Sequence, residues 1–285
     1  MSLVLENVKK TYKAFELDLS MTIEPGCITG LIGRNGAGKS TTFKAILGLI
    51  KLSDGRVLID GKEPEKLTER EKEDIGVVLA ESGFGGHMTV KDVIAVMNAM
   101  YHKFDKSAFV SKCNQFEIPL NQKIKEFSTG MKAKLKILLA ISHGAKLLIL
   151  DEPTAGLDVV VRNQILDLLR EYMEDEENSI LISSHISSDL EGLCDDVYFI
   201  ENGKIILHEE TDALMDEYGV LKVTSEQYHK LEKSYILCAK EDKYGCNCLT
   251  NQRQYFAENY PDIVIEKCGI DEVISLMLGN RKEGR

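Results

Sequence analysis

The hydrophobic and polar positions of this chain repeat with two periods, one typical of strands and the other of helices. Strict alternation over residues 16–23 predicts a half-buried strand, and the short apolar run 27–32 predicts a buried one. The apolar stretch 41–50 predicts a helix, and residues 56–61 predict another strand, closed by an Asp-Gly turn. The N-terminal part of the chain is therefore expected to alternate strands and helices.

A helical period dominates the next part of the chain. Apolar residues recur at i, i+3, i+4 and i+7 over 90–101, after Thr89 as the N-cap. Helical spacing recurs over 107–117 and 131–142. We expect these helices to form a subdomain over about 82–145, inserted into the surrounding β/α pattern.

The strand pattern returns in the second half of the chain. Four apolar residues and two acids close the stretch 146–152, which predicts a strand buried on both faces. Residues 179–184 predict the next strand, and 197–207 predict a hairpin with a two-residue turn. Further on, short strands alternate with helices. We therefore expect two domains, residues 1–218 and a small α+β domain over 219–285.

Composition narrows the class of protein. The chain has 35 Lys and Arg against 46 Asp and Glu, and no basic stripe, so nucleic acid is not an expected partner. No apolar run approaches the roughly 18 residues of a transmembrane helix. Residues 1–6 lack the pattern of a signal peptide. We therefore expect a cytoplasmic chain.

The 7 cysteines are scattered, and their odd number is consistent with reduced thiols. Cys246 and Cys248 could begin a metal site, but no second cysteine pair or histidine pair completes four ligands. Small hydrophobic side chains in a hairpin are the simpler interpretation.

The clearest motif is a glycine-rich loop between the strand 27–32 and the helix that follows it. Its glycines let backbone N–H groups line a cavity of partial positive charge, which favours phosphate groups. Lys39 adds a full charge for the β- and γ-phosphates, and Ser40 offers a hydroxyl to Mg²⁺. The loop matches G-x-x-x-x-G-K-[ST] and consists of Gly33, Arg34, Asn35, Gly36, Ala37, Gly38, Lys39, Ser40 and Thr41.

Two acids follow the apolar run of the strand at 146–152. Asp151 is placed to hold Mg²⁺ from the end of a neighbouring strand. Glu152, one residue further on, is placed to polarise a water molecule against the γ-phosphate as a general base. An Asp-Glu pair alone is weak evidence, but the phosphate loop upstream makes it strong.

Three further segments carry a family resemblance. Phe127-Ser128-Thr129-Gly130-Met131 precedes the acidic pair, Ala155-Gly156-Leu157-Asp158 follows it, and His185 ends a later strand. In this order the motifs resemble those of the ATP-binding subunits of ATP-binding-cassette (ABC) transporters, over residues 1 to about 210. The resemblance implies a P-loop NTPase of the α/β class. In this fold a β/α core carries the phosphate loop, and an inserted helical subdomain carries Phe127–Met131, which we call the signature segment.

The resemblance also implies roles for individual residues. Tyr12, otherwise a packing residue, would stack on adenine, and His185 would sense the γ-phosphate. Ser128 reads as the N-cap of the helix over 131–142, so the positive end of that helix faces outward. Ser128 and Gly130 would then donate to the γ-phosphate of ATP bound on a second subunit, either an identical chain or a close paralogue.

The chain departs from the family pattern at one position. The family has a glutamine that contacts Mg²⁺ and the attacking water after a strand like the one predicted at 75–79, and alignment places Ala80 there. Alanine has neither a metal ligand nor a hydrogen-bond donor in its side chain. Either the adjacent Glu81 takes this role, or the site works without that contact.

These observations favour an ATP hydrolase that uses ATP and Mg²⁺ and powers transport through a separately encoded membrane permease. The signature variant resembles the form common in exporter-type ATPases, so we expect export, with the chain at the inner face of the cell membrane through its permease. The alternative that Ala80 suggests is a nucleotide-gated dimerising module with little hydrolysis. ABC proteins of translation or DNA repair have two cassettes or long coiled coils, and neither pattern is present here.

Overall fold

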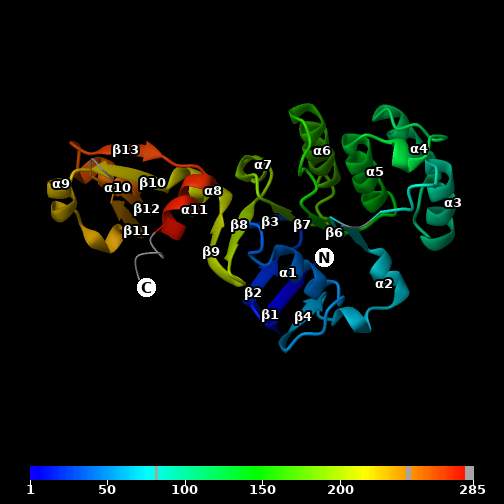
Figure 1. Cartoon of the computed structure of the whole chain (residues 1–285), viewed down its shortest axis with the longest axis horizontal. Helices are drawn as coiled ribbons and strands as arrows, with labels where there is room; N and C mark the ends of the chain where they lie inside the picture. Colours follow the sequence, from blue (N-terminus) through cyan, green and yellow to red (C-terminus); the bar gives the residue numbers. More distant parts are fainter. Residues whose placement is uncertain (81–82, 242–244, 280–285) are drawn as a thin grey trace. The chain divides into compact units, whose positions relative to one another are not determined.

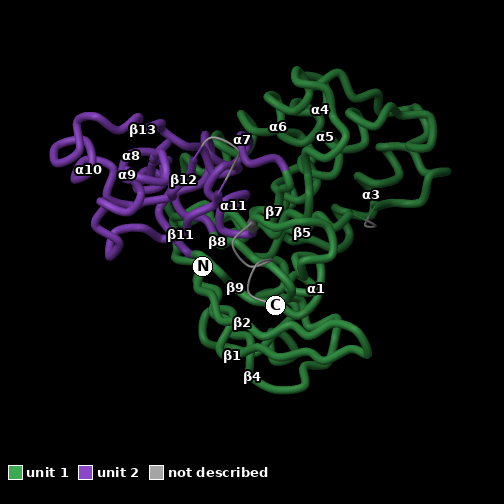
Figure 2. The backbone as a smooth tube through the Cα atoms, turned by 60° about the vertical axis from the view of Figure 1, so that its left-hand side comes forward, with its two compact units in different colours: residues 1–185, 198–207 green, residues 186–197, 208–285 purple. Residues whose placement is uncertain are grey.

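The computed structural model describes residues 1–80, 83–241 and 245–279. Its backbone divides into two compact units, residues 1–185 with 198–207 and residues 186–197 with 208–285 (Figure 2). The predicted domain boundary between residues 218 and 219 stays a prediction. We describe each unit by itself.

The N-terminal strands form an antiparallel sheet in the order β2-β1-β4 (Figure 1). These strands are β1 (Leu3–Thr11), β2 (Glu16–Ile23) and β4 (Asp54–Ile59). Alternate residues of β2 are buried, which confirms the half-buried strand predicted from its pattern. The buried side of this sheet packs into the main hydrophobic core of the first unit, together with Phe43 and Ile46.

A second sheet has six strands in the order β5-β6-β7-β3-β8-β9. They are β3 (Ile28–Ile32), β5 (Ile75–Val78), β6 (Leu147–Asp151), β7 (Ser179–Ser184), β8 (Asp196–Glu201) and β9 (Lys204–Glu210). The neighbours β5, β6, β7 and β3 are parallel. Every residue of β3, β6 and β7 is buried, as expected for apolar strands covered on both faces.

The parallel pairing decides where the motifs meet. The carboxyl ends of parallel strands lie at one edge of the sheet, so the segments that follow β3, β6 and β7 come together there. These segments are the phosphate loop, the acidic pair and His185. The predicted hairpin is present as β8 and β9, joined by Asn202 and Gly203 with φ of 48° and 77°.

The described residues of the first unit form six helices, and each predicted helix in this part is present within a few residues of its expected bounds. They are α1 (Lys39–Ile46), α2 (Glu69–Glu73), α3 (Val90–Met100), α4 (Lys106–Gln115), α5 (Thr129–Ile141) and α6 (Val159–Tyr172). Single 3₁₀ turns lie at Pro64–Lys66 and Ile124–Glu126. Helix α5 packs against α4 and α6 (Figure 1).

The second unit is built on a four-stranded antiparallel sheet in the order β11-β12-β10-β13. Its strands are β10 (Gly219–Val223), β11 (Cys238–Glu241), β12 (Cys246–Thr250) and β13 (Val264–Lys267). Its helices are α7 (Ser187–Glu191), α8 (Thr211–Asp216), α9 (Ser225–Lys230), α10 (Arg253–Asn259) and α11 (Ile270–Gly279), with a 3₁₀ turn at Lys233–Tyr235. The expected mixture of short strands and helices is therefore present.

Cys246 and Cys248 lie on β12 in the β11–β12 hairpin, inside the core of the second unit. Their Sγ atoms are 3.6 Å apart, and burial raises the pKa of the Cys248 thiol to about 12. Within residues 1–80, 83–241 and 245–279, no cluster of three or more His, Cys, Asp or Glu side chains could hold a metal ion. Both cysteines act as small packing groups.

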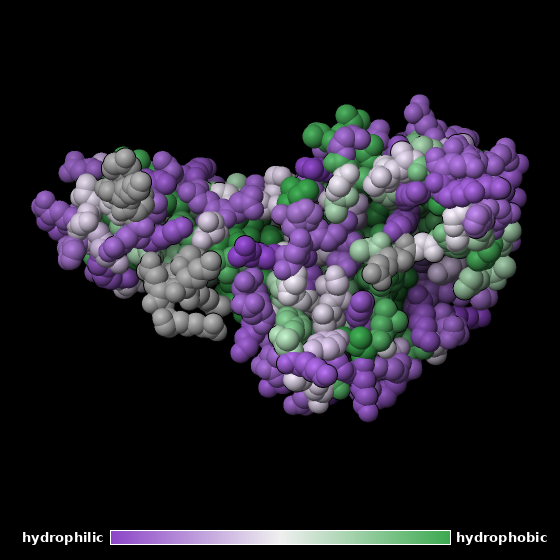
Figure 3. All heavy atoms as spheres, viewed as in Figure 1, coloured by the Kyte–Doolittle hydropathy of each residue, from purple (hydrophilic) through white to green (hydrophobic). Residues whose placement is uncertain are grey.

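Polar and charged residues cover most of the face shown in Figure 3, and apolar residues gather in separate patches. Among the described residues, no helix is both long and apolar enough to span a bilayer. Two exposed valines, Val159 and Val160, begin helix α6.

Candidate active site

The phosphate loop connects β3 to α1, and its backbone requires glycine at two positions. Gly38 has φ +121°, and a Cβ there would lie 3.0 Å from the Phe15 ring. A Cβ at Gly33 would lie 2.5 Å from the carbonyl oxygen of Ile200. Helix α1 begins at Lys39 with no side-chain cap and no acid in its first turn. Its positive end is therefore directed into the loop.

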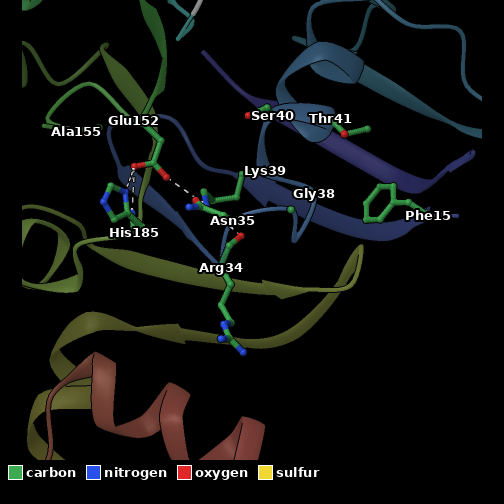
Figure 4. A pocket seen from close by; sticks show the side chains of 11 residues that line it. Phe15, Arg34, Asn35, Gly38, Lys39, Ser40, Thr41, Glu152, Ala155 and His185 are labelled. Carbon is green, nitrogen blue, oxygen red and sulfur yellow. Dashed lines mark hydrogen bonds and ion pairs between the residues drawn. The ribbon is translucent and has the colours of Figure 1, made fainter.

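The loop forms one wall of a cavity of about 440 Å³ (Figure 4). The cavity is lined by Phe15, Arg34, Asn35, Gly36, Gly38, Lys39, Ser40, Thr41, Glu152, Ala155 and His185. Predicted site residues outside this lining are Tyr12, Gly33, Ala37, Ser128, Gly130 and Asp151. The Arg34 side chain points away from Lys39 and Glu152 in the close view (Figure 4).

Lys39 is the cation at the centre of the cavity, and its side chain is only 6% exposed. Its Nζ donates to the Gly33 carbonyl oxygen at 2.6 Å and lies 3.2 Å from Oε1 of Glu152. Oε1 is buried and accepts no hydrogen bond of good geometry from the described residues, so the ammonium holds it by charge alone. The structure therefore brings a buried cation and a carboxylate together inside the loop.

Glu152 also contacts His185. The carboxylate Oε2 lies 2.5 Å from Nδ1 of His185 and accepts the His185 backbone N–H at 3.2 Å. The backbone of Glu152 has φ +52°, a left-handed conformation that costs an L-residue on the order of 1–3 kcal/mol. This strain could not be predicted from the residue type, because glutamate rarely adopts a left-handed conformation.

Asp151 lies one residue earlier, at the end of β6, and is 4% exposed. Its Oδ1 accepts a hydrogen bond from the hydroxyl of Ser183 at 2.8 Å. The same Ser183 oxygen accepts the backbone N–H of Glu152 at 3.0 Å. Sequence reasoning missed Ser183, although it is the first polar residue after the apolar run 180–182, just as Asp151 is after 147–150.

Comparison with known proteins agrees with this geometry. The sequence profile of the family described as "ABC transporter" matches residues 17–155. The ABC transporter ATP-binding protein YtrB of Bacillus subtilis is 36% identical over 201 residues, which cover 70% of this chain and 68% of YtrB. The lantibiotic transport ATP-binding protein SrtF of Streptococcus pyogenes is 35% identical, over 74% of this chain and 92% of SrtF.

This chain belongs to the ABC transporter ATP-binding proteins. A solved ATP-binding subunit of an ABC transporter has the same fold, with a TM-score of 0.67 at 26% identity over 75% of this chain and 92% of that one. The predicted fold class, a P-loop NTPase with an inserted helical subdomain, is confirmed. As a member of the family the chain binds ATP and is an ATPase.

Two aromatic residues of this ABC protein lie in the turn between β1 and β2, and the sequence analysis selected only one of them, Tyr12. Tyr12, expected to stack on adenine, is 45% exposed and does not line the cavity. Phe15, three residues later, lines the cavity and packs against Gly38. The Tyr12 N–H donates to the Phe15 carbonyl oxygen at 2.8 Å, and the two ring centroids are 6.3 Å apart. A tight turn between β1 and β2 therefore holds both rings close together.

The signature segment of the ABC domain begins α5. The Ser128 hydroxyl accepts the backbone N–H of Met131 at 3.1 Å, which confirms the predicted N-cap. A Cβ at Gly130 would lie 3.1 Å from the Val161 side chain, so the close approach of α5 to α6 leaves little room for a larger residue there. Neither Ser128 nor Gly130 lines the cavity of the same chain.

Ala80 occupies the position where the family has its glutamine. Ala80 does not line the cavity, and its carbonyl oxygen accepts a hydrogen bond from the Lys136 ammonium at 3.3 Å. Glu81, the proposed substitute for the glutamine, lies outside the described residues.

Proposed function

We propose that this chain is the subunit that binds and hydrolyses ATP to power export through a separately encoded membrane permease. The observation that carries the proposal is the convergence of Lys39, Glu152 and His185 on the phosphate loop. The name of SrtF refers to lantibiotic transport, which supports a transport role for this chain. The chain then lies at the inner face of the cell membrane, held there by its permease.

The residues around the cavity fit the triphosphate of ATP. The loop amides and the N-terminus of α1 supply partial positive charge, and Lys39 supplies a full charge. The bond from Lys39 to Gly33 holds the ammonium in the centre of the loop, where a β- or γ-phosphate oxygen can replace the Glu152 carboxylate as its partner. Replacing that carboxylate releases Glu152 for its own role.

The donor set also fits Mg²⁺, which prefers oxygen ligands. Ser40 presents a hydroxyl to the cavity, and Asp151 provides a carboxylate at the adjacent strand end. We assign these two residues to the metal, which would supply charge neutralisation on the phosphates. Ser40 and Asp151 would hold the ion, and the ion would neutralise charge on the phosphates.

We assign the role of general base to Glu152. Its carboxylate lies between Lys39 and His185 at the edge where the phosphates would end, so a water molecule there can transfer its proton to an oxygen of Glu152. His185 holds Oε2 from the other side, and in this arrangement it both orients the carboxylate and faces the γ-phosphate. A carboxamide at position 152 would keep the shape and lose the basicity.

The decisive experiment is the Glu152→Gln variant. We expect it to bind ATP as the parent does and to lose turnover, because the amide cannot accept the proton. Steady-state phosphate release and equilibrium binding of a fluorescent ATP analogue measure the two quantities separately. Turnover within about twofold of the parent would remove Glu152 from the role of base.

We further propose that ATP joins two copies of the chain, or this chain and a paralogue, about a two-fold axis. Ser128 and Gly130 lie on the N-terminus of α5, outside their own cavity, and would complete the cavity of the other subunit. Each phosphate loop then meets the partner's signature segment through the same rotation. The mass of Glu152→Gln in solution, with and without Mg²⁺-free ATP, tests this proposal. A monomer in both conditions at tens of micromolar would contradict it.

Ala80 favours a second candidate function. Without a side-chain ligand at that position, the protein could use ATP chiefly to dimerise and hydrolyse it very slowly. The turnover rate of the parent protein separates this candidate from the first, because the first requires sustained hydrolysis with Mg²⁺.

A further inference from the structure

Ser183 lies at the centre of the parallel sheet, on β7. The register pairs it with Asp151 on β6 and with Leu31 on β3. It is fully buried, at 0% exposure, and follows three apolar residues of the same strand. A hydroxyl buried this deeply must be hydrogen-bonded, since an unpaired one would be strongly unfavourable.

The hydroxyl makes two hydrogen bonds of opposite sense. It donates to Oδ1 of Asp151 at 2.8 Å and accepts the backbone N–H of Glu152 at 3.0 Å. Parallel pairing explains the first bond, because paired residues on neighbouring strands direct their side chains to the same face. One oxygen atom thus connects the carboxylate of one acid to the backbone of the next.

The second bond acts where the backbone is strained. Glu152 has φ +52°, and such a conformation persists only where the surrounding structure holds it. Its N–H is held by Ser183, and its carboxylate is held by Lys39 and His185. Without the Ser183 hydroxyl, the Glu152 N–H would lose its hydrogen bond to the side chain of β7.

From these contacts we propose that Ser183 is a positioning residue for ATP hydrolysis. It does not line the cavity, and it acts by fixing the Asp151 carboxylate relative to the Glu152 side chain. This inference rests on the proposed roles of Asp151 at the metal and Glu152 as base. It adds a residue on the neighbouring strand β7 that sets the geometry between them.

The chain contains a closely matched control on the same strand. Ser179 is also 0% exposed, and its hydroxyl also accepts a backbone N–H and donates to an oxygen, those of Gly26 and Met1. It lies at the start of β7, whereas Ser183 lies near the end that faces the cavity. Ser179→Ala therefore removes the same kind of buried hydroxyl without touching the acidic pair.

The experiment compares Ser183→Ala, Ser183→Cys and Ser179→Ala with the parent chain. Cysteine fills the site, but its thiol is a weak donor and acceptor. We expect both Ser183 variants to lower kcat about tenfold or more, and to raise the Mg²⁺ concentration that gives half-maximal turnover. Binding of Mg²⁺-free ATP should change by less than about threefold in both, because the phosphate loop is untouched.

Ser179→Ala should keep kcat within about twofold of the parent, even where its thermal midpoint falls as far as that of Ser183→Ala. Turnover of Ser183→Ala equal to that of Ser179→Ala would overturn the proposal, as would parental turnover and Mg²⁺ dependence in Ser183→Cys. Should Ser183→Ala fail to fold, Ser183→Cys decides the question. A parent chain without turnover, or an active Glu152→Gln, would instead reject the proposed function.

Discussion

Two helices of the first unit begin at motifs assigned to the same phosphate group, but they begin differently. Helix α1 follows Gly38, which offers no side chain, and its first turn contains Lys39. Helix α5 follows Ser128, whose hydroxyl already accepts the N–H of Met131. Neither helix has an acid in its first turn. Both positive ends are thus kept clear of carboxylates belonging to the helix itself.

This difference indicates that the two helix starts depend on ATP in different ways. The start of α1 is lined by backbone groups and a buried lysine, so an anion is the natural partner of that end. The start of α5 is stabilised by its own serine, so the helix can stand alone on the surface until a second subunit approaches. We infer that ATP binds first at α1 and that contact with α5 follows.

The largest expected effect comes from removing the charge at α1. Lys39→Ala should weaken ATP binding tenfold or more and reduce turnover by about 100-fold or more, because this buried ammonium is the charge that we assign to the phosphates. Lys44→Ala, in the last turn of the same helix and exposed, is the matched control. Calorimetric titration with ATP measures the affinity. Equal affinities in the two variants would place the triphosphate elsewhere.

The next largest effect distinguishes an N-cap that only stabilises its helix from an N-cap that also contributes to the ATP-dependent dimer. Ser128→Ala and Thr89→Ala each remove the N-cap of one helix, α5 and α3, and should lower stability by roughly 1 kcal/mol. Only Ser128→Ala should weaken the ATP-dependent dimer, and Ser128→Arg should abolish it. Sedimentation of each variant, combined with Glu152→Gln in the same chain, measures whether the ATP-dependent dimer forms. A dimer that Ser128→Arg leaves unchanged would disprove the role of α5.

A smaller effect concerns the aromatic end of the cavity beside α1. Phe15→Ala should weaken ATP by about 1 kcal/mol, because the ring lines the cavity and packs on Gly38. If Tyr12 also stacks on adenine, Tyr12→Ala should lose about as much while Tyr12→Phe stays nearly neutral. Equal losses in Tyr12→Ala and Tyr12→Phe would point to the hydroxyl, and no loss in either would leave Phe15 as the contact.

The smallest effect is expected at a third helix, α2, where the cap contains an acid. Contact with Lys62 and hydrogen bonds from Thr68 lower the pKa of Glu71 from 4.5 to about 2. A lowered carboxyl pKa stabilises the fold above pH 4.5, and this contribution is lost as the pH falls from there toward 2. The difference in the free energy of unfolding between the parent and Glu71→Gln should therefore close over that pH range. Urea titration at each pH measures both free energies.

Glu69→Gln on the same helix provides the control for that measurement. Its carboxylate is 92% exposed, so its stability should follow that of the parent at every pH. A gap for Glu71→Gln that stays constant between neutral and acid pH would argue against the capping interaction as its source.

The sequence predicted the features that local pattern controls. The phosphate loop, the apolar strands and the capped helices each depend on neighbours within a few positions, as the Ser128 cap shows. Strand β12 was read only as part of a hairpin, because its cysteines carry little strand signal. Ser183 was missed because its partners, Asp151 and Glu152, lie at and just after the end of another strand, far away in the sequence.

The two aromatic residues show the same limit on a smaller scale. A family pattern selected Tyr12, and the structure adds Phe15, three residues later, to the lining of the cavity. The length of a turn decides which of two nearby rings faces inward, and hydrophobicity alone does not report it. The strained conformation of Glu152 was equally hidden, since no local signal favours it.

That left-handed conformation at Glu152 also has an evolutionary consequence. Asparagine, aspartate and glycine adopt such a backbone readily, whereas β-branched residues rarely do. In a saturation library, the first group should keep normal cellular abundance while losing transport, and valine or isoleucine should lose both. With the proposed role of Glu152 as base, position 152 therefore has two separate requirements, one for a carboxylate and one for a residue that adopts a positive φ.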